Sequence, residues 1–318
     1  MLTADDLTLA HDRIADAVVR TPVWRSPQLD AALGREVHLK CELFQPTGAF
    51  KLRGATNAIR QLPAGTRGVV TESSGNHAQA IAYAGKAAGL RVIVVMAGDS
   101  NPAKKAATEA LGATVVSEDV DVLTRTHVAR DLAEREGYAF VHPFDDWHVI
   151  AGQATAALEL IADAPALDSI VAPIGGGGLL AGTVLACRHR SRSTEVYGAE
   201  PAGGPDAYES LRTGARVALA EPPVTIADGA RTAQLGERTF AVLREGCAGI
   251  QLVSDDAMRE ALALCWRTTR LLIEPTAAMP IAAILAGAIP GDRIGVILSG
   301  GNVDATALAA TIRNQQGG

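Results

Sequence analysis

The sequence is poor in cysteine, and its cysteines are not arranged for chemistry. Cys41, Cys187, Cys247 and Cys265 are spread over a chain of 318 residues. None of them has the short spacing to another that zinc knuckles and redox pairs require. We therefore expect reduced thiols within the core.

The chain also lacks charge runs of one sign and long apolar runs. Its net charge is −6 and it has no lysine or arginine block, which argues against nucleic acid or an anionic membrane surface as a partner. No segment approaches the roughly 20 apolar residues of a membrane span. The start MLTADDLTLAHDRIADAVV lacks the features of a signal peptide, so we expect a cytoplasmic protein that binds small molecules.

What is present is the pattern of an α/β protein. From residue 68 onward, short β-branched runs alternate with alanine-rich helical patterns, which is typical of parallel strands joined by crossover helices. Helices are predicted over residues 255–273 and 275–288. The predicted strands cover residues 68–72, 91–96, 113–117, 138–142, 169–174, 195–200 and 293–299.

The length is sufficient for about two domains. We predict a large domain made of residues 1–62 and 143–318, and a small domain made of residues 63–142. Within the small domain, Asn101 is suited to cap a helix, Pro102 to its first turn and Gly112 to its end.

Three segments repeat one arrangement, a strand followed by a glycine-rich turn and a helix. They are VVTESSGNHAQAIAYAG, IVAPIGGGGLLAGTVLA and GVILSGGNVDATALAA. In parallel α/β sheets such turns lie at the carboxyl ends of the strands, where helix amino termini offer free N–H groups to anions. The three turns predict one large anionic ligand.

The glycine run at residues 175–178 predicts a phosphate site. Four positions without a side chain let the backbone approach a tetrahedral oxyanion closely, and the dipole of the following helix adds attraction. GGGGLLAG matches neither the dinucleotide fingerprint nor the Walker pattern. The alternative, a flexible turn, fits poorly between an apolar strand and an alanine-rich helix.

SSGNH, residues 73–77, is more polar than a helix start requires. A single serine suffices as an N-cap, so capping would explain Ser73 or Ser74 but not Asn76 and His77. We interpret the segment as a binding loop for a carboxylate or a phenolic oxygen. Ser299, in SGGN, either faces the same ligand or belongs to a tight turn.

Lys51 lies in FQPTGAFKLRGATNAIRQL, where a turn meets an amphipathic helical pattern and Phe50 and Leu52 predict burial. A buried lysine facing a phosphate loop is what a pyridoxal-phosphate enzyme needs, because the lysine forms an imine and the loop fixes the phosphate. Burial would also lower the pKa of the amine and free it to act as a base.

These residues resemble the fold type II pyridoxal-phosphate family, in particular its threonine/serine dehydratase and serine racemase branch. FQPTGAFKLRGA, ESSGNHAQA, HPFDDWHVIAGQ, PIGGGGLLAG, EPTAA and ILSGGN occur in the family's order over nearly the whole chain. The resemblance implies a two-lobed α/β fold of the tryptophan-synthase-β type, with parallel twisted sheets flanked by helices. It also implies pyridoxal 5′-phosphate as cofactor and a homodimer.

The resemblance gives each matching residue a role. Lys51 would be the Schiff-base lysine, and Ser74 would match the serine that acts on the opposite face of the cofactor in racemases. The residues implied at the cofactor are Phe50, Lys51, Asn76, Gly175, Gly176, Gly177, Gly178, Leu179, Glu274 and Ser299. Those implied at the substrate are Ser73, Ser74, Gly75, Asn76 and His77.

The implied reaction is the conversion of a 3-hydroxy amino acid, such as L-threonine or L-serine, to a 2-oxo acid and ammonia. Serine or aspartate-type racemisation and 3-hydroxyaspartate dehydration remain alternatives, and a β-replacement synthase would share the fold and Lys51. A non-catalytic protein would be expected to have lost the lysine or the substrate loop. With no room after SGGN for a regulatory domain, we do not expect feedback control by isoleucine.

Some positions depart from the family pattern. Phe144 stands where racemases often carry asparagine, which favours a dehydratase. Arg231, in ADGARTAQLGERTF, would read a second carboxylate on the substrate or be a surface arginine. Ala49, Ala154 and Trp147 also differ from the residues common in the family.

Glu200 and Asp206 bracket a Gly-Pro turn in AEPAGGPDAYES. By spacing alone, two such acids are usually solvated. The resemblance aligns Glu200, the backbone of Gly204 and Asp206 with a divalent-cation site, so Mg²⁺ or Ca²⁺ is expected there as a structural and activating ion.

Overall fold

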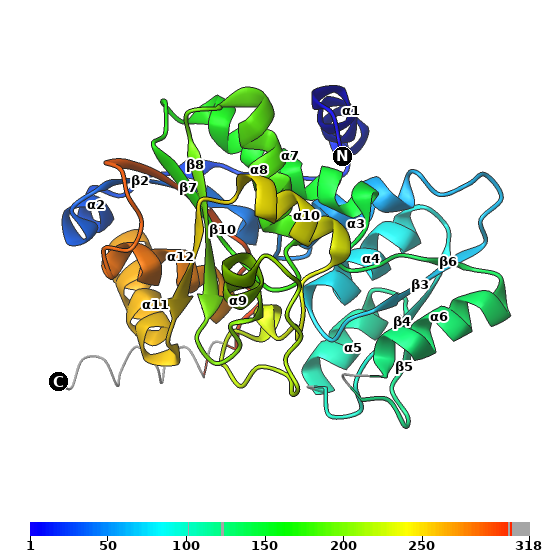
Figure 1. Ribbon diagram of the computed structural model, residues 1–318. Coiled ribbons are helices and arrows are strands. Elements are labelled where there is room, and N and C mark those ends of the chain that lie inside the picture. Colours follow the sequence, from blue (N-terminus) through cyan, green and yellow to red (C-terminus); the bar gives the residue numbers. More distant parts are fainter. Residues whose placement is uncertain (101, 122–123, 305, 307–318) are drawn as a thin grey trace.

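The computed structural model describes residues 1–100, 102–121, 124–304 and 306. Its elements gather in two lobes, each built around a sheet (Figure 1). Both sheets consist of parallel strands with helices against them, apart from one short antiparallel edge strand. The predicted α/β class is therefore confirmed.

The sheet of the larger lobe draws its strands from both ends of the chain. The amino-terminal strand β2 pairs in parallel with the carboxy-terminal strand β10, with Val37 opposite Ile294. The sheet order is β1 (Val23–Trp24), β2 (Glu36–Cys41), β10 (Arg293–Leu298), β7 (Ser169–Pro173), β8 (Glu195–Pro201) and β9 (Gly249–Val253).

The smaller sheet is entirely parallel. Its order is β5 (Thr114–Val116), β4 (Arg91–Val95), β3 (Gly68–Glu72) and β6 (Ala139–Phe140). These are the four strands expected between residues 68 and 142, with β6 shorter than expected. All four lie within the predicted small domain, and the domain limits themselves stay a prediction.

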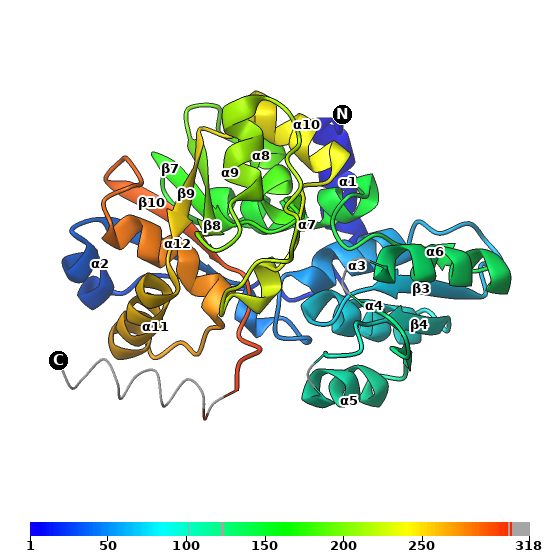
Figure 2. The same ribbon diagram turned by 60° about the horizontal axis from the view of Figure 1, so that its bottom comes forward.

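Helices cover both faces of the smaller sheet, as Figure 2 shows for α6 on one side and α4 on the other. Val69 and Val92 pack toward α4, whereas Val70 and Val95 pack toward α6. This opposite direction follows from the alternation of side chains along a strand, and it explains why strands buried on both faces are apolar throughout. The helices of this lobe are α4 (Asn76–Ala87), α5 (Pro102–Ala110) and α6 (Arg125–Glu136).

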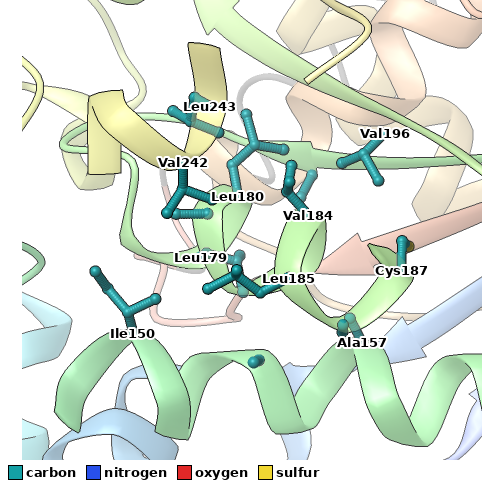
Figure 3. Packing of buried hydrophobic residues seen from close by; sticks show 14 of the residues in the cluster. Ile150, Ala157, Leu179, Leu180, Val184, Leu185, Cys187, Val196, Val242 and Leu243 are labelled. Atoms are coloured by element: carbon teal, nitrogen blue, oxygen red, sulfur yellow. The ribbon is translucent and has the colours of Figure 1, made fainter. Parts of the chain in front are cut away.

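In the larger lobe, α8 (Gly178–Arg190) lies between α7 (Trp147–Asp163) and α10 (Glu237–Gly246) (Figure 3). Every residue of α8 from 178 to 187 is buried, which is why its sequence is apolar on all sides. The remaining helices are α1 (Ala4–Ile14), α2 (Pro27–Leu33), α3 (Lys51–Ile59), α9 (Asp206–Thr213), α11 (Asp255–Thr269) and α12 (Pro275–Leu285), with short 3₁₀ turns η1 (Glu42–Phe44) and η2 (Asp228–Ala230). Within the described residues, no helix combines the length and apolarity needed to cross a bilayer.

Some sequence expectations need correction. The helix predicted over residues 255–273 ends at Thr269, because Arg270 adopts a left-handed conformation with φ of 64° and closes the helix. Strands β2 and β9 were not predicted. Asn101 and the helix expected after SGGN lie outside the described residues, whereas Pro102 begins α5 as expected and Gly112 has a φ of 95°.

Candidate functional site

A cavity of about 620 Å³ opens at the carboxyl ends of β3, β7 and β10, between the two lobes. Lys51 and Phe50 line it from the start of α3. It is lined by every residue predicted at the cofactor or the substrate, namely Phe50, Lys51, Ser73, Ser74, Gly75, Asn76, His77, Gly175, Gly176, Gly177, Gly178, Leu179, Glu274 and Ser299. The predicted metal residues Glu200, Gly204 and Asp206 do not line it.

Lys51 is the first residue of α3, and its Nζ donates a hydrogen bond of 2.8 Å to the carbonyl oxygen of Pro143. Burial lowers the pKa of the amine from 10.5 to about 8, and the negative charge of Glu72 opposes part of that shift. A substantial fraction of the amine is therefore uncharged near neutral pH, which is the form that acts as nucleophile and base.

Two residues further along α3, Arg53 anchors the helix inside the protein. Its fully buried guanidinium donates to both carboxylate oxygens of Glu42, at 2.7 and 2.8 Å, and to both of Glu159, at 2.8 Å each. Lys40 lies 2.7 Å from Glu159 and completes the network. Because buried charges are tolerated only when paired this closely, the network fixes where α3 begins and so where Lys51 stands.

The glycine run forms the tight turn between β7 and α8. A Cβ atom on Gly176 would lie 2.4 Å from the ring of Phe144, and one on Gly177 would lie 2.9 Å from Thr239. Gly177 also has a φ of 92°, a conformation that side chains disfavour. The free N–H groups at the start of α8 therefore border the cavity without side chains, as a bound phosphate requires.

Asn76, at the start of α4, is held by residues of the larger lobe. Its Nδ2 donates to Glu274 at 2.8 Å, and its Oδ1 accepts from the side-chain amide of Asn302 at 2.9 Å. Burial raises the pKa of Glu274 to about 7, and the hydrogen bond from Asn76 opposes the shift. The amide is thus oriented by partners far away in the sequence.

Two buried hydroxyl groups at the cavity have no hydrogen-bond partner among the described residues. They are the Oγ of Ser299, which follows β10, and the Oγ1 of Thr232. Buried hydroxyl groups are normally satisfied. Their position at the cavity wall indicates that a ligand supplies the partner.

The SSGNH segment does not act as a helix cap. Gly75 is the N-cap residue of α4, and no side chain caps this helix. Ser73 accepts from the Gly75 N–H at 3.3 Å, and Ser74 accepts from the Ser100 hydroxyl at 2.7 Å. His77 is buried, which keeps its pKa well below 6.5, and its Nε2 lies 3.1 Å from the hydroxyl of Thr71.

The sequence interpretation missed charged residues of the cavity wall. Glu72 is buried at the end of β3, its Oε1 accepts from Thr126 and its Oε2 lies 2.6 Å from Nε of Arg125. Burial raises the pKa of Glu72, while Arg125 opposes this. The signal available was a carboxylate at a strand end directly before SSGNH. Nothing in the sequence indicates that Lys104 pairs with Asp228 from the other lobe.

Glu200 and Asp206 are both buried where β8 leads into α9. Glu200 accepts from the N–H groups of Ala207 and Tyr208, at 2.7 and 2.8 Å, whereas Oδ2 of Asp206 has no partner among the described residues. Burial raises the pKa of Glu200 to about 8 and that of Asp206 to about 7. No cluster of three or more histidine, cysteine or acidic side chains suited to a metal occurs in the part of the chain that the structure describes.

Comparison with known proteins identifies the family. Residues 14–300 match the model of the family described as pyridoxal-phosphate dependent enzyme. The chain belongs to this family. As a pyridoxal-phosphate dependent enzyme, it has the cofactor for which the lysine and the glycine loop were interpreted.

Several relatives of this pyridoxal-phosphate dependent enzyme cover nearly all of it. Serine racemase of Schizosaccharomyces pombe is 43% identical, over 95% of this chain and 94% of the relative. L-threo-3-hydroxyaspartate ammonia-lyase of Saccharomyces cerevisiae is 40% identical, over 99% and 98%. The crystal structure of a threonine deaminase, from an organism abbreviated T.th., is 46% identical with a TM-score of 0.92, over 95% and 99%. The predicted fold type II branch is thereby confirmed, and its members differ in reaction and substrate.

Proposed function

We propose that the protein is an ammonia-lyase that converts a 3-hydroxy amino acid, L-threonine or L-serine, to a 2-oxo acid and ammonia. The observation that carries the proposal is the placement of Lys51 in one cavity with the glycine loop and the unpartnered hydroxyl of Ser299. A serine hydroxyl at the pyridine nitrogen does not favour a protonated ring, which suits prompt elimination.

The residues present fit pyridoxal 5′-phosphate. The N–H groups of residues 175–179 would hold the phosphate, Asn76 the phenolic oxygen and Ser299 the ring nitrogen, with Phe50 beside Lys51. Glu274 would act through its hydrogen bond to Asn76. When bound, the cofactor supplies an electron sink for the negative charge that develops at the substrate's α-carbon.

The chain's own residues would bind the substrate and move its protons. The N–H groups and hydroxyl groups of residues 73–77 would hold the substrate carboxylate at the start of α4. Nζ of Lys51, uncharged in part because its pKa is about 8, would take the α-proton. The β-hydroxyl then leaves as water, and hydrolysis of the dehydrated product releases the 2-oxo acid and ammonia.

A second candidate substrate is 3-hydroxyaspartate. Lys104 and Arg231 share a single carboxylate, Asp228, at the cavity wall, so this cluster carries one unbalanced positive charge. A second substrate carboxylate would neutralise it. Relatives named L-threo-3-hydroxyaspartate ammonia-lyase, at 40 and 41% identity, support the same candidate.

The reaction is tested by supplying the holoenzyme with L-threonine, L-serine and L-threo-3-hydroxyaspartate and measuring 2-oxo acid release and the enantiomer ratio of the remaining substrate. We expect 2-oxo acid from at least one substrate with little change in enantiomer ratio. A changing ratio without 2-oxo acid would establish the racemase alternative, in which Ser74 exchanges the proton on the other face. Arg231→Ala should reduce only turnover of the hydroxyaspartate.

We further propose Mg²⁺ or Ca²⁺ at Glu200 and Asp206, together with the carbonyl oxygen of Gly204. Two buried carboxylates with raised pKa values, one of them with an unpartnered oxygen, are suited to a hard cation. The ion would stabilise the turn before α9. Homodimerisation stays a prediction, tested by the sedimentation of the 32.9 kDa chain.

A further inference from the structure

The loop from His142 to Asp146 connects β6 to α7 and borders the amine of Lys51. Its Pro143 carbonyl oxygen is the acceptor for Nζ of Lys51 at 2.8 Å. No other hydrogen bond of this amine is formed among the described residues. The position of that single carbonyl therefore sets the direction in which the amine points.

The loop is held in shape from within by His142. Its Nδ1 accepts from the backbone N–H of Phe144 at 3.3 Å and from that of Asp145 at 2.9 Å. Burial lowers the pKa of His142 to about 4, so the ring is neutral and Nδ1 is free to accept. The turn that follows Pro143 is thus fixed to the ring that precedes it.

From outside, the loop is attached to α10 by Asp145. Its carboxylate accepts from the N–H of Glu237 at 3.1 Å and from that of Arg238 at 2.8 Å. The N-cap residue of α10 is Gly236, which has no side chain, and a Cβ there would lie 2.5 Å from the carboxylate. Asp145 therefore serves as the cap of a helix 92 residues away in sequence.

The same turn of α10 holds the glycine loop. The carbonyl oxygen of Gly176 accepts from the hydroxyl of Thr239 at 2.8 Å and from the N–H of Gly236 at 3.4 Å. One helix start is thus bonded both to the predicted phosphate loop and to the loop that orients Lys51. Phe144 packs between them, in contact with Gly176.

We infer that Asp145 is a positioning residue, which by capping α10 sets the amine of Lys51 in register with the glycine loop. It does so through Pro143 and α10, without contact to Lys51. The inference rests on the proposed covalent attachment of pyridoxal 5′-phosphate at Lys51, in which the amine nitrogen forms a C=N bond with the cofactor's aldehyde carbon and water leaves.

The test measures how fast cofactor-free protein forms this bond, from the absorbance change at saturating pyridoxal 5′-phosphate. Asp145→Ala should slow bond formation by at least about tenfold, because the amine loses its orientation. Asp145→Asn should stay within about threefold of the wild type, because asparagine is an equally good cap. Ser254→Ala, which removes the distant cap of α11, should leave the rate unchanged.

A second arm separates the lysine from the phosphate loop. Pyridoxine 5′-phosphate lacks the aldehyde and reports phosphate binding alone. Thr239→Val should weaken its binding by about fivefold, since Gly176 loses a hydrogen bond. Asp145→Ala should change its binding by less than about threefold, because Thr239 remains.

The outcomes separate this inference from the function on which it rests. A wild type that forms no covalent bond would overturn the cofactor proposal itself. A wild type that forms the bond at the same rate as Asp145→Ala would overturn the positioning role alone. Equal slowing in Asp145→Asn and Asp145→Ala would also contradict it, because charge rather than capping would then be responsible.

Discussion

At the scale of single residues, the amine of Lys51 combines burial with one carbonyl acceptor. Burial favours the uncharged form, so half of the amine is available at a pH of about 8 instead of 10.5. The rate of covalent capture of pyridoxal 5′-phosphate should therefore rise with pH through a midpoint near 8. Glu72→Gln should lower this midpoint, since the carboxylate favours the charged amine. A wild-type midpoint near the ordinary lysine value would contradict the burial of the amine.

Ser299 gives a second residue-scale prediction. Its buried hydroxyl has no partner in the described protein, so Ser299→Ala should leave the free energy of unfolding unchanged or slightly higher. Binding of pyridoxine 5′-phosphate should weaken by about 1 kcal/mol, or roughly fivefold, through the lost contact to the ring nitrogen.

Ser169→Ala is the matched control for Ser299→Ala. Ser169 is equally buried, but its hydroxyl donates to the carbonyl of Pro290 at 2.7 Å. It should lower stability by about 1 kcal/mol and leave binding unchanged. A loss of stability without a loss of binding in Ser299→Ala would show that this hydroxyl does not face the ligand.

At the scale of elements, α3 carries two arginines in opposite settings. Arg53→Met should lower the free energy of unfolding by about 3–5 kcal/mol, because Glu42 and Glu159 would lose their main buried partner. Arg60→Met, at the end of the same helix, removes an exposed pair with Asp16 and should cost at most about 1 kcal/mol. Denaturant unfolding measures both. Similar costs would contradict the anchoring of α3 by Arg53.

The turn between β8 and α9 predicts a pH-dependent effect of cations. Because folding raises the pKa values of Glu200 and Asp206, the folded chain holds more protons than the unfolded chain between their ordinary values and about 8. Without an ion, these groups therefore make stability fall as pH rises through that range. Mg²⁺ or Ca²⁺ should raise the unfolding temperature above pH 8 and have little effect below pH 6, and Glu200→Gln should abolish the effect. Stabilisation by the ion that persists in Glu200→Gln would place it elsewhere.

At the scale of the whole molecule, the cavity is assembled from both lobes and from both ends of the chain. Asn76 of the smaller lobe meets Glu274 and Asn302 of the larger one, and Lys104 meets Asp228. Strand β2 brings the amino-terminal part, including the start of α3, beside β10 and Ser299. The lobes therefore complete one site that neither contains alone.

The sequence predicted much of this because glycine turns at the ends of parallel strands gather at one sheet edge. Residues 175–178 and Ser299 could be found in this way. The acceptor for Lys51 and the cap supplied by Asp145 could not, because their partners are 92 residues away along the chain. Strands β2 and β9 were missed because each is short and mixes polar with apolar residues.

The most direct test of the account is to fix the cofactor to the protein and locate it. Purified protein loaded with pyridoxal 5′-phosphate would be reduced with borohydride and digested, and its peptides analysed by mass. The account predicts the reduced cofactor on Lys51, with none on the Lys51→Ala variant. A label on another lysine, or equal labelling of the variant, would contradict the central assignment.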